Sequence, residues 1–357
     1  RRNMKRIGFL MERLCKKENA LQAIEEINED RKDNKTAQWV ERTKEERAEE
    51  LCEIARNFHP KPARTFERYD PTAGKTRIIN EPALWPDQYI HHMIVQVLKP
   101  ILMRGMDYFC CGSIPGRGPH REKKAIEKWL DKDRKGTKYG AEADIKKFYD
   151  SLSPRVVMRF LCRKIKDREF LALIWKIIKA GIKIGFYISQ WLANAVLEPL
   201  DHYIREKLGI RRYGRYIDNF TFFGPNKKKL HKAIRAIMEC LARMGLRLKE
   251  NWQVYNTRKR MVDAVGYRMK RGLTLIRKRN LLRLKRQCTR ASKRIEARQR
   301  VDPKQARGIL SRAGQLKHCA GKKQYEKHVL PIRPVLKNAV READKRRRNL
   351  CLNTRSA

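Results

Sequence analysis

The feature that most constrains this chain is its excess of positive charge. The 357 residues include 86 Lys and Arg but 39 Asp and Glu, which gives a formal net charge of +47 at pH 7. A polymer of phosphates is the expected partner, because each Lys or Arg placed on a phosphate releases a condensed counterion. Disordered basic tails reach similar charges, but 41% hydrophobic residues, with 6 Trp, 12 Tyr and 11 Phe, indicate a packed core. The charge thus excludes a typical metabolic enzyme acting on small anions.

The excess charge is unevenly distributed along the chain. Residues 1–60 have a net charge of +1, residues 61–267 a net charge of +22 and residues 268–357 a net charge of +24. Half of the excess therefore lies in the last quarter of the chain. This division predicts three regions with different partners.

The cysteines and the apolar segments indicate the redox environment of the protein and whether it associates with a membrane. Nine cysteines, an odd number without CxxC spacing, predict neither a disulfide framework nor a zinc site. They are typical of a reduced, cytoplasmic protein. No apolar run approaches the length of a membrane span, so we expect no membrane association.

Hydrophobic spacing predicts a chain of the α+β class. Helices are expected over residues 4–57, 87–104, 153–163, 167–179, 188–207 and 227–244, and again from residue 280 onward. Strands are expected on either side of a turn at residues 71–74 and then over residues 138–145, 211–223 (a hairpin), 246–255 and 262–269. Long helices that return to short strands give the α+β class.

Two aspartates stand where strands are expected to end or turn. Asp144 ends one predicted strand, and Asp218 lies between aromatic residues of the predicted hairpin. Either one alone is expected to be structural, in a buried ion pair with Arg, because an unpaired buried carboxylate costs desolvation free energy. Together they could form a hard oxygen site for Mg²⁺, and two such ions can activate a hydroxyl nucleophile and stabilise a leaving pyrophosphate. The pair therefore predicts phosphoryl transfer.

The order of several motifs resembles the palm of reverse transcriptases. The motifs are residues 141–151 (AEADIKKFYDS), 184–190 (IGFYISQ) and 216–219 (YIDN). The G-x-x-x-S-Q element of residues 185–190 most resembles the reverse transcriptases of diversity-generating retroelements, because group II intron enzymes and retrons have PQG followed by SP there. Supporting matches extend the resemblance over about residues 5–330; they are residues 75–79, 87–92, 110–118, 265–268 and 314–318. The resemblance implies a right-hand polymerase fold with an N-terminal helical extension.

The resemblance also implies roles for single residues. Asp144 and Asp218 would bind two Mg²⁺ ions, for which Mn²⁺ can substitute, and residue 219 would complete the catalytic set. Tyr149 would be the steric gate that excludes the 2′-hydroxyl of a ribonucleotide. The other nucleotide-binding residues would be Lys75 and Arg77 at the triphosphate, Lys249 near the leaving pyrophosphate, and Ile184, Gly185 and Gln190 of the 184–190 element. Gly266 and Tyr267 would form the primer grip.

Several of these residues have a plainer alternative. Ile184 and Tyr149 could be ordinary core packing, and Arg77 could contact RNA backbone. In related enzymes a Gln stands at the position of Ile184, and in the retroelement family an apolar residue there is associated with low fidelity opposite adenine. Asn219 departs from the family, which has a second Asp, and the amide lowers the expected metal affinity. A tolerated natural variant, an engineered inactive form and a non-catalytic descendant are the three explanations.

The leading hypothesis is an RNA-directed DNA polymerase that copies template RNA into adenine-mutagenised cDNA. Its partners would be template RNA, cDNA, dNTP and a basic oligomeric accessory protein. The near-neutral helices of residues 1–60 could be the docking face for that accessory protein. Alternatively, these helices are solvated amphipathic helices that cover a larger domain. The other hypotheses are a phage-defence or other bacterial reverse transcriptase, and an RNA-binding descendant impaired by Asn219. We expect a helical extension at residues 1–60, fingers at 61–138, palm at 139–269 and a basic helical thumb with a tail at 270–357.

Overall fold

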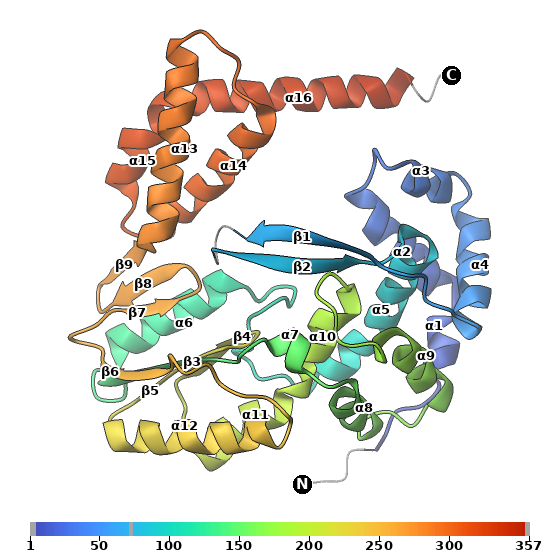
Figure 1. Cartoon of the computed structure of the whole chain (residues 1–357), viewed down its shortest axis with the longest axis horizontal. Coiled ribbons are helices and arrows are strands. Elements are labelled where there is room, and N and C mark those ends of the chain that lie inside the picture. Colours follow the sequence, from blue (N-terminus) through green and yellow to red (C-terminus); the bar gives the residue numbers. More distant parts are fainter. Residues whose placement is uncertain (1–4, 71–73, 354–357) are drawn as a thin grey trace. The chain divides into compact units, whose positions relative to one another are not determined.

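The computed structural model describes residues 5–70 and 74–353, which fall into two compact units. The first unit comprises Arg1–Glu122 and Tyr139–Tyr255, and the second comprises Lys123–Lys138 and Asn256–Ala357. Helices and antiparallel sheets occur in both (Figure 1), so the predicted α+β class is confirmed. The boundaries expected for the extension, fingers, palm and thumb stay predictions.

The N-terminal helices of the first unit share one hydrophobic core with the central sheet. Leu10, Ile24 and Leu51 are fully buried in the same cluster as Ala141 and Phe220 of that sheet. Apolar residues at three- and four-residue spacing give each helix one buried face. These helices, seen in blue in Figure 1, and the one that follows them are α1 (Leu10–Leu14), α2 (Lys17–Glu29), α3 (Lys35–Arg42), α4 (Lys44–Arg56) and α5 (Tyr89–Met103).

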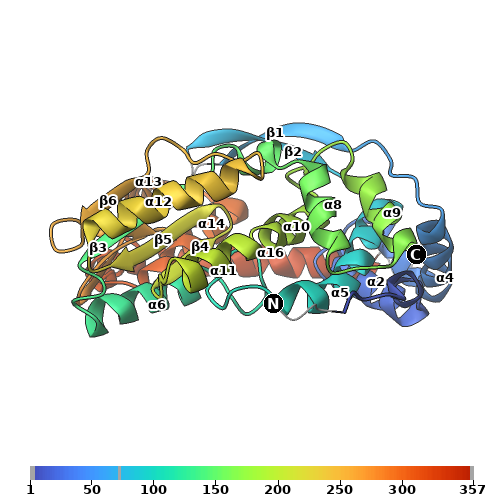
Figure 2. The same cartoon turned by 90° about the horizontal axis from the view of Figure 1, so that it is seen from below.

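A four-stranded antiparallel sheet in the order β4-β5-β3-β6 forms the centre of the first unit. Its register places Asp144, the last residue of β3, directly opposite Asn219, the first residue of β5. Helix α12 (Lys227–Ala242) packs on β3 and β5 (Figure 2). The strands are β3 (Tyr139–Asp144), β4 (Tyr213–Tyr216), β5 (Asn219–Gly224) and β6 (Gln253–Asn256).

Strands β1 (Arg64–Asp70) and β2 (Lys75–Glu81) form a separate antiparallel hairpin. Both strands were expected, while the turn predicted at residues 71–74 lies mostly outside the described residues. The base of β2 is tied to the segment before α10 (Tyr187–Val196), because the backbone N–H of Asn80 donates a 2.8 Å hydrogen bond to the carbonyl oxygen of Ile184. The hairpin is therefore anchored to the rest of the unit at one end.

Shorter helices complete the first unit between these elements. They are η1 (Leu84–Gln88), α7 (Phe148–Ser151), α8 (Pro154–Cys162), α9 (Arg168–Ile178), α11 (Glu198–His202) and η2 (Tyr203–Lys207). Helix α6 (Pro119–Lys132) begins in the first unit and ends in the second.

The second unit joins a three-stranded sheet to a helical bundle with its own core. The sheet has the order β7-β8-β9, and its turn at Arg271–Gly272 bonds to the end of α6, where Arg271 Nε donates to the carbonyl of Leu130 at 2.7 Å. A second apolar cluster includes Leu284, Ile309 and Leu336. The elements are β7 (Val262–Ala264), β8 (Tyr267–Lys270), β9 (Leu273–Ile276), α13 (Lys278–Glu296), α14 (Pro303–Leu316), α15 (Lys322–His328), η3 (Leu330–Ile332) and α16 (Arg333–Asn353).

Several predicted elements differ from the observed ones. The strand expected over residues 262–269 is a hairpin, because Val265 and Gly266 both have positive φ and reverse the chain. A strand was expected over residues 246–255, but the observed strand is the shorter β6. The single helix expected over residues 188–207 is divided into α10, α11 and η2. Strand β9 and helix α6 were not predicted. Among the described residues no helix is both long and apolar enough to cross a membrane, and the eight cysteines whose side chains the structure describes are free thiols.

Gly185 provides a test of how the β1–β2 hairpin is anchored. Its φ is +109°, and a Cβ there would lie 2.2 Å from the carbonyl oxygen of Asn80. Gly181 has a similar φ of +113° but open space around it. We expect Gly181→Ala to lower the free energy of unfolding by about 1–3 kcal/mol through backbone strain, and Gly185→Ala to lower it by about a further 1–3 kcal/mol through the clash. Urea denaturation measures the free energy of unfolding of both variants. An equal loss of stability in the two variants would contradict the close packing of Gly185 against Asn80.

Candidate active site

Asp218 is presented by a tight and unfavourable turn. Tyr216 and Asn219 form the last pair between β4 and β5, so Ile217 and Asp218 make a two-residue connection. Ile217 has a φ of 58°, which is disfavoured for a β-branched residue. Such a conformation persists only where surrounding interactions hold it in place.

A buried guanidinium supplies those interactions. The side chain of Arg215, 0% exposed, pairs with Asp201, 1% exposed, through Nη2–Oδ2 at 2.6 Å, and its Nε donates to Asp201 Oδ1 at 2.8 Å. Its Nη1 donates to the carbonyl of Ile217 at 2.8 Å, while Asn194 accepts through its side-chain and backbone oxygens at 3.2 and 3.1 Å. The hydroxyl of Tyr213 also donates to Asp201. Arg215 therefore joins α10 and α11 to the turn that carries Asp218.

The loop before α6 approaches the same turn closely. A Cβ on Gly112 would lie 2.4 Å from Ile217 Cγ1 and 2.6 Å from its backbone nitrogen. The amide of Asn194 donates to the carbonyl of Gly112 at 2.7 Å, and the backbone of Cys111 donates to that of Arg215 at 2.8 Å. Only glycine fits at position 112 without moving the turn.

The two predicted aspartates lie close enough to interact strongly. Burial and the neighbouring Asp144 carboxylate raise the pKa of Asp218 to about 6, whereas Lys249 acts in the opposite direction. The backbone of Ile145 donates to the carbonyl of Asp218 at 3.1 Å, which links the end of β3 to the turn. The strand ends thus bring together the two carboxylates that the sequence placed 74 residues apart.

Lys249 is joined to Asp144 at two points. Its ammonium forms an ion pair with Asp144 Oδ2, and its backbone N–H donates to the backbone carbonyl of Asp144 at 2.7 Å. The prediction that Lys249 lies at the site is compatible with this position. The structural alternative for Asp144, an ion pair with Arg, is not what the structure contains; the buried Asp–Arg pair belongs to Asp201.

Two carboxylates with a free oxygen are compatible with a divalent cation. Asp144 Oδ1 is buried and accepts no hydrogen bond within the described part of the chain. In the same part no group of three or more His, Cys, Asp or Glu could hold a metal ion. Mg²⁺ is commonly held by one or two carboxylates together with substrate phosphates and water, so Asp144 and Asp218 fit that ion as far as protein ligands are concerned.

Asn219 lies beside this pair on the exposed side of the turn. Its Nδ2 donates to Asp218 Oδ1 at 3.0 Å. An Asp at this position would lack that donor and would add a third negative charge. The Asn219 amide therefore donates to the Asp218 carboxylate. In the motif that the sequence resembles, this position would instead hold a second Asp, which would be a further metal ligand.

Two of the predicted nucleotide-binding residues belong to the same electrostatic environment. Burial raises the pKa of Tyr149 to about 12; Asp218 also raises it and Arg77 lowers it. Arg77, on β2, donates through Nε to Asp70 Oδ2 at 3.0 Å. The phenol of Tyr149, the guanidinium of Arg77 and the carboxylate of Asp218 are thus near one another. Lys75 is the first residue of β2, and its side chain lies outside the described part of the structure.

The three predicted nucleotide-binding residues of the 184–190 element differ in their exposure to solvent and in their contacts. Ile184 is half-buried, Gly185 makes the close approach to Asn80 described above, and Gln190 is exposed on α10. The structure thus gives Gly185 a packing role that requires no ligand. The nucleotide-binding role of these three residues stays a prediction.

The predicted primer grip lies in the second unit. Gly266 has a φ of +88° in the β7–β8 turn, which suits glycine. Tyr267 is 3% exposed, and its hydroxyl donates to the carbonyl of Gln315 on α14 at 3.3 Å. Its side chain ties the sheet to the helical bundle, so a contact of this turn with a primer would fall to the backbone.

Arg215, Asp201 and Asn194 have no expected role from the sequence alone. One feature of the sequence does point to a buried ion pair. Arg215 stands two residues before the turn, in a strand, β4, whose other members are Gly and Tyr. An ionisable residue in such a strand must find a buried partner. The partner lies on α11, and nothing in the local sequence identifies it.

The comparison with protein families agrees with this geometry. Residues 60–269 match the family described as reverse transcriptase (RNA-dependent DNA polymerase). The chain belongs to the reverse transcriptase family. The right-hand polymerase fold that the motifs predicted is thereby confirmed.

Curated relatives match only part of this chain. Protein YkfC of Escherichia coli is 28% identical over 169 residues, which are 43% of this chain and 44% of YkfC. The group II intron-encoded protein LtrA of Lactococcus lactis is 24% identical over 200 residues, 52% of this chain and 32% of LtrA. The chain therefore spans less than half of the length of these relatives.

Solved structures with a similar backbone are more distant. A telomerase from Candida albicans in complex with a TWJ fragment of telomeric RNA has a TM-score of 0.48 and 13% identity, covering 66% of this chain and 51% of the telomerase. Apo telomerase from Candida tropicalis has a TM-score of 0.42 and 13% identity, covering 55% and 45%.

The raised pKa of Asp218 gives a prediction about stability. The folded protein holds this proton up to about pH 6, against an ordinary value of 3.8, so the wild-type free energy of unfolding rises as the pH falls between these values. Asp218→Asn removes the repulsion with Asp144. We expect the variant to be about 1–3 kcal/mol more stable than the wild type at pH 7.5 and equally stable near pH 4.

Urea denaturation across this pH range measures the difference. Asp150→Asn is the control for the loss of one carboxylate, because Asp150 is exposed on α7. A destabilised Asp218→Asn variant at pH 7.5 would show that the carboxylate is favourably paired.

Proposed function

We propose that this chain is an RNA-directed DNA polymerase that acts by nucleotidyl transfer at Asp144 and Asp218. The observation that carries the proposal is the paired carboxylates at the ends of two strands, with one buried oxygen lacking a hydrogen-bond donor. The family match supports it, because the matched residues 60–269 contain both aspartates. The net charge of +47 suits a template and product made of phosphodiesters.

In the proposed reaction, the 3′-hydroxyl oxygen of the primer forms a bond to the α-phosphorus of a dNTP. The bond between the α-phosphorus and its bridging oxygen breaks, pyrophosphate leaves, and the hydroxyl proton is lost to solvent. Two divalent ions, when bound at Asp144 and Asp218, would polarise the hydroxyl and neutralise the leaving group. Arg77 would bind the triphosphate, for which its planar guanidinium is suited.

Lys249 and Tyr149 would act on the nucleotide from the protein side. Lys249 is close enough to Asp144 to reach a leaving pyrophosphate at the same carboxylate, where its ammonium can neutralise charge or donate a proton. Tyr149 would fill the space of a ribose 2′-hydroxyl. Its neighbours Asp218 and Arg77 support a position beside the incoming nucleotide.

The retroelement type is a further part of the proposal. It is supported by the G-x-x-x-S-Q order of residues 185–190 and by the apolar Ile184, which would make synthesis opposite adenine error-prone. A basic accessory protein would suit helix α4, where Glu45, Glu46, Glu49 and Glu53 are exposed. Template RNA, cDNA and dNTP are the other proposed partners, and a cytoplasmic location stays a prediction.

Primer extension on an RNA template tests the proposed function. We expect low synthesis by the wild-type chain in Mg²⁺, a larger yield in Mn²⁺, and a gain of about tenfold or more for Asn219→Asp, because a restored carboxylate strengthens the metal site. Asp144→Asn is the inactive control.

Absence of synthesis by Asn219→Asp in both metals would refute the polymerase and favour an RNA-binding descendant. Sequencing the cDNA tests the retroelement type separately. Misincorporation concentrated opposite template adenines is expected, and an even error spectrum would favour another bacterial reverse transcriptase.

The steric-gate role of Tyr149 predicts a change in sugar selectivity. Tyr149→Val should open space beside the nucleotide and raise incorporation of ribonucleotides relative to deoxyribonucleotides by about 10- to 100-fold, equivalent to about 1.4–2.7 kcal/mol of lost discrimination. Tyr149→Phe is the matched control and should keep the selectivity, since it retains the ring. The ratio of kcat/KM values for dNTP and rNTP, measured with Asn219→Asp as background, gives the result. An unchanged ratio in Tyr149→Val would assign Tyr149 to core packing.

A further inference from the structure

Glu122, in the first turn of α6, is a buried acid to which neither the sequence nor the proposed reaction gives a role. It is 1% exposed, and its Oε2 is buried and accepts no hydrogen bond within the described part of the chain. A Cβ on Gly214 of β4 would lie 3.6 Å from Glu122 Cγ and Oε1, so the carboxyl group packs against the backbone of that strand. An ionised carboxylate there would lose its hydration without a compensating donor at Oε2.

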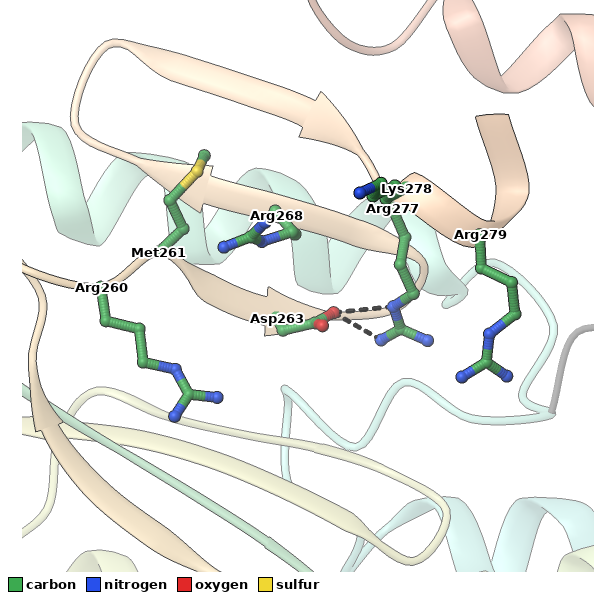
Figure 3. Close-up of a pocket in the computed structure, with 7 residues that line it drawn as sticks. All are labelled: Arg260, Met261, Asp263, Arg268, Arg277, Lys278 and Arg279. Carbon is green, nitrogen blue, oxygen red and sulfur yellow. Dashed lines mark hydrogen bonds and ion pairs between the residues drawn. The ribbon is translucent and has the colours of Figure 1, made fainter. Parts of the chain in front are cut away.

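Other inward-facing carboxylates show what an ionised group needs. Glu198 accepts a 2.9 Å hydrogen bond from the ammonium of Lys164. Asp263 lies among five basic side chains in the pocket drawn in Figure 3, and Arg277 Nη2 is 2.6 Å from its Oδ1. Glu122 Oε2 has no such donor among the described residues, so the neutral, protonated carboxyl group suits this site better than the carboxylate.

The guanidinium of Arg215 cannot supply the missing donor. Arg215 follows Gly214 in β4, so its side chain leaves the opposite face of the strand. Its five N–H groups are already used, one on Nε and two each on Nη1 and Nη2, for the acceptors of α10, α11 and the turn described above. Burial raises the pKa of Glu122 to about 8, and the charge of Arg215 acts against this rise.

Two further titratable groups lie beside Glu122. They are Cys111, in the loop before α6, and Tyr216, the last residue of β4. Burial raises the pKa of both groups, to about 12 for Cys111, and the charge of an ionised Glu122 raises them further. Glu122 is therefore the member of this cluster that ionises first as the pH rises.

The cations that flank Glu122 on α6 are engaged elsewhere. Lys123 forms an ion pair with Glu127 at 2.7 Å. The guanidinium of Arg121 lies over the ring of Tyr108, 3.8 Å from its centroid. Ionised Glu122 would thus have to find its hydration in water.

Residues 109–112 join the surroundings of α6 to the turn that carries Asp218. Their backbone exchanges hydrogen bonds of 2.8 and 3.0 Å with the backbone of Arg215, and Gly112 packs closely against Ile217. A carboxylate that left β4 for water would part the first turn of α6 from this strand. The contacts that hold the turn would be loosened with it.

We propose that Glu122 is a pH-sensitive positioning residue for the turn that carries Asp218. While it is protonated, its carboxyl group stays packed on β4 and the turn keeps its geometry. At alkaline pH the carboxyl proton is lost to solvent, the carboxylate moves toward water, and the turn is released. The proposal rests on the proposed function only for the effect on synthesis, because the opening itself needs no substrate.

The pH dependence of stability tests this switch. A carboxyl group whose pKa is raised by folding contributes stability that is present below its ordinary pKa of 4.5 and is lost as the pH rises through the folded value of about 8. Over this range the unfolding equilibrium constant of the wild type, relative to that of Glu122→Gln, should rise by up to about tenfold per pH unit. Urea denaturation at pH 5, 6, 7 and 8 measures the ratio, and a ratio independent of pH would overturn the proposal.

Two more variants make this measurement specific. Glu122→Met cannot ionise and keeps an unbranched side chain of similar length, so it should give the same trend as Glu122→Gln. Glu239→Gln is the control for the loss of one carboxylate, because Glu239 is exposed on α12. An equally large trend in Glu239→Gln would mean a general effect of charge and would overturn the proposal.

Hydrogen exchange of residues 213–219 separates a positioning role from plain packing. At pH 7 the wild type and Glu122→Gln should exchange alike. At pH 9 the wild type should exchange about tenfold faster than the variant, because one pH unit above the pKa favours the ionised form tenfold. Equal exchange at pH 9 would confine Glu122 to packing and would overturn the proposal.

Primer extension in the Asn219→Asp background gives the functional measurement. With Glu122 present, the rate should fall by about tenfold between pH 8 and pH 9, and with Glu122→Gln this fall should be absent. The same alkaline fall in both chains would overturn the positioning role. Absence of synthesis at every pH, together with the expected exchange result, would refute the polymerase and leave the switch standing.

Discussion

The candidate active site depends on one buried ion pair, that of Arg215 with Asp201. A guanidinium without solvent exposure is tolerated only when its donors are satisfied, and here acceptors come from Asp201, Asn194 and the carbonyl of Ile217. Removing one partner of such a pair leaves an uncompensated charge in the core. The same interactions fix the strained turn that presents Asp218, so the stability of this part of the first unit and the geometry of the Asp144–Asp218 pair have a common origin.

Local sequence pattern predicted those features that depend on neighbouring residues. The strands of the β1–β2 hairpin, helix α12 and the ends of β3 and β5 follow from apolar spacing and turn residues. The meeting of Asp144 with Asp218 was predicted from the family resemblance, and the antiparallel register of β3 and β5 gives it a physical cause. Chain reversal at Val265–Gly266 was missed because a valine with positive φ is rare.

Other features depend on long-range contacts and could not be predicted from a single sequence. Glycine at position 112 is explained by the backbone of Ile217, and Gly185 is explained by the carbonyl of Asn80. In both cases the constraint comes from a segment about 100 residues away in the chain. The cations around Asp263 likewise come together only when β7, β8 and the start of α13 are folded against one another.

The two oxygens of Asp144 have unequal environments. Oδ2 already has a counterion in the ammonium of Lys249, whereas Oδ1 is buried without a donor. Under the proposed function, a divalent cation would find Oδ1 without a hydrogen-bond donor, whereas at Oδ2 it would compete with the ammonium of Lys249. The unequal oxygens would favour ligation at Oδ1 first, and an ammonium released from Oδ2 would then be available to neutralise charge on a bound triphosphate.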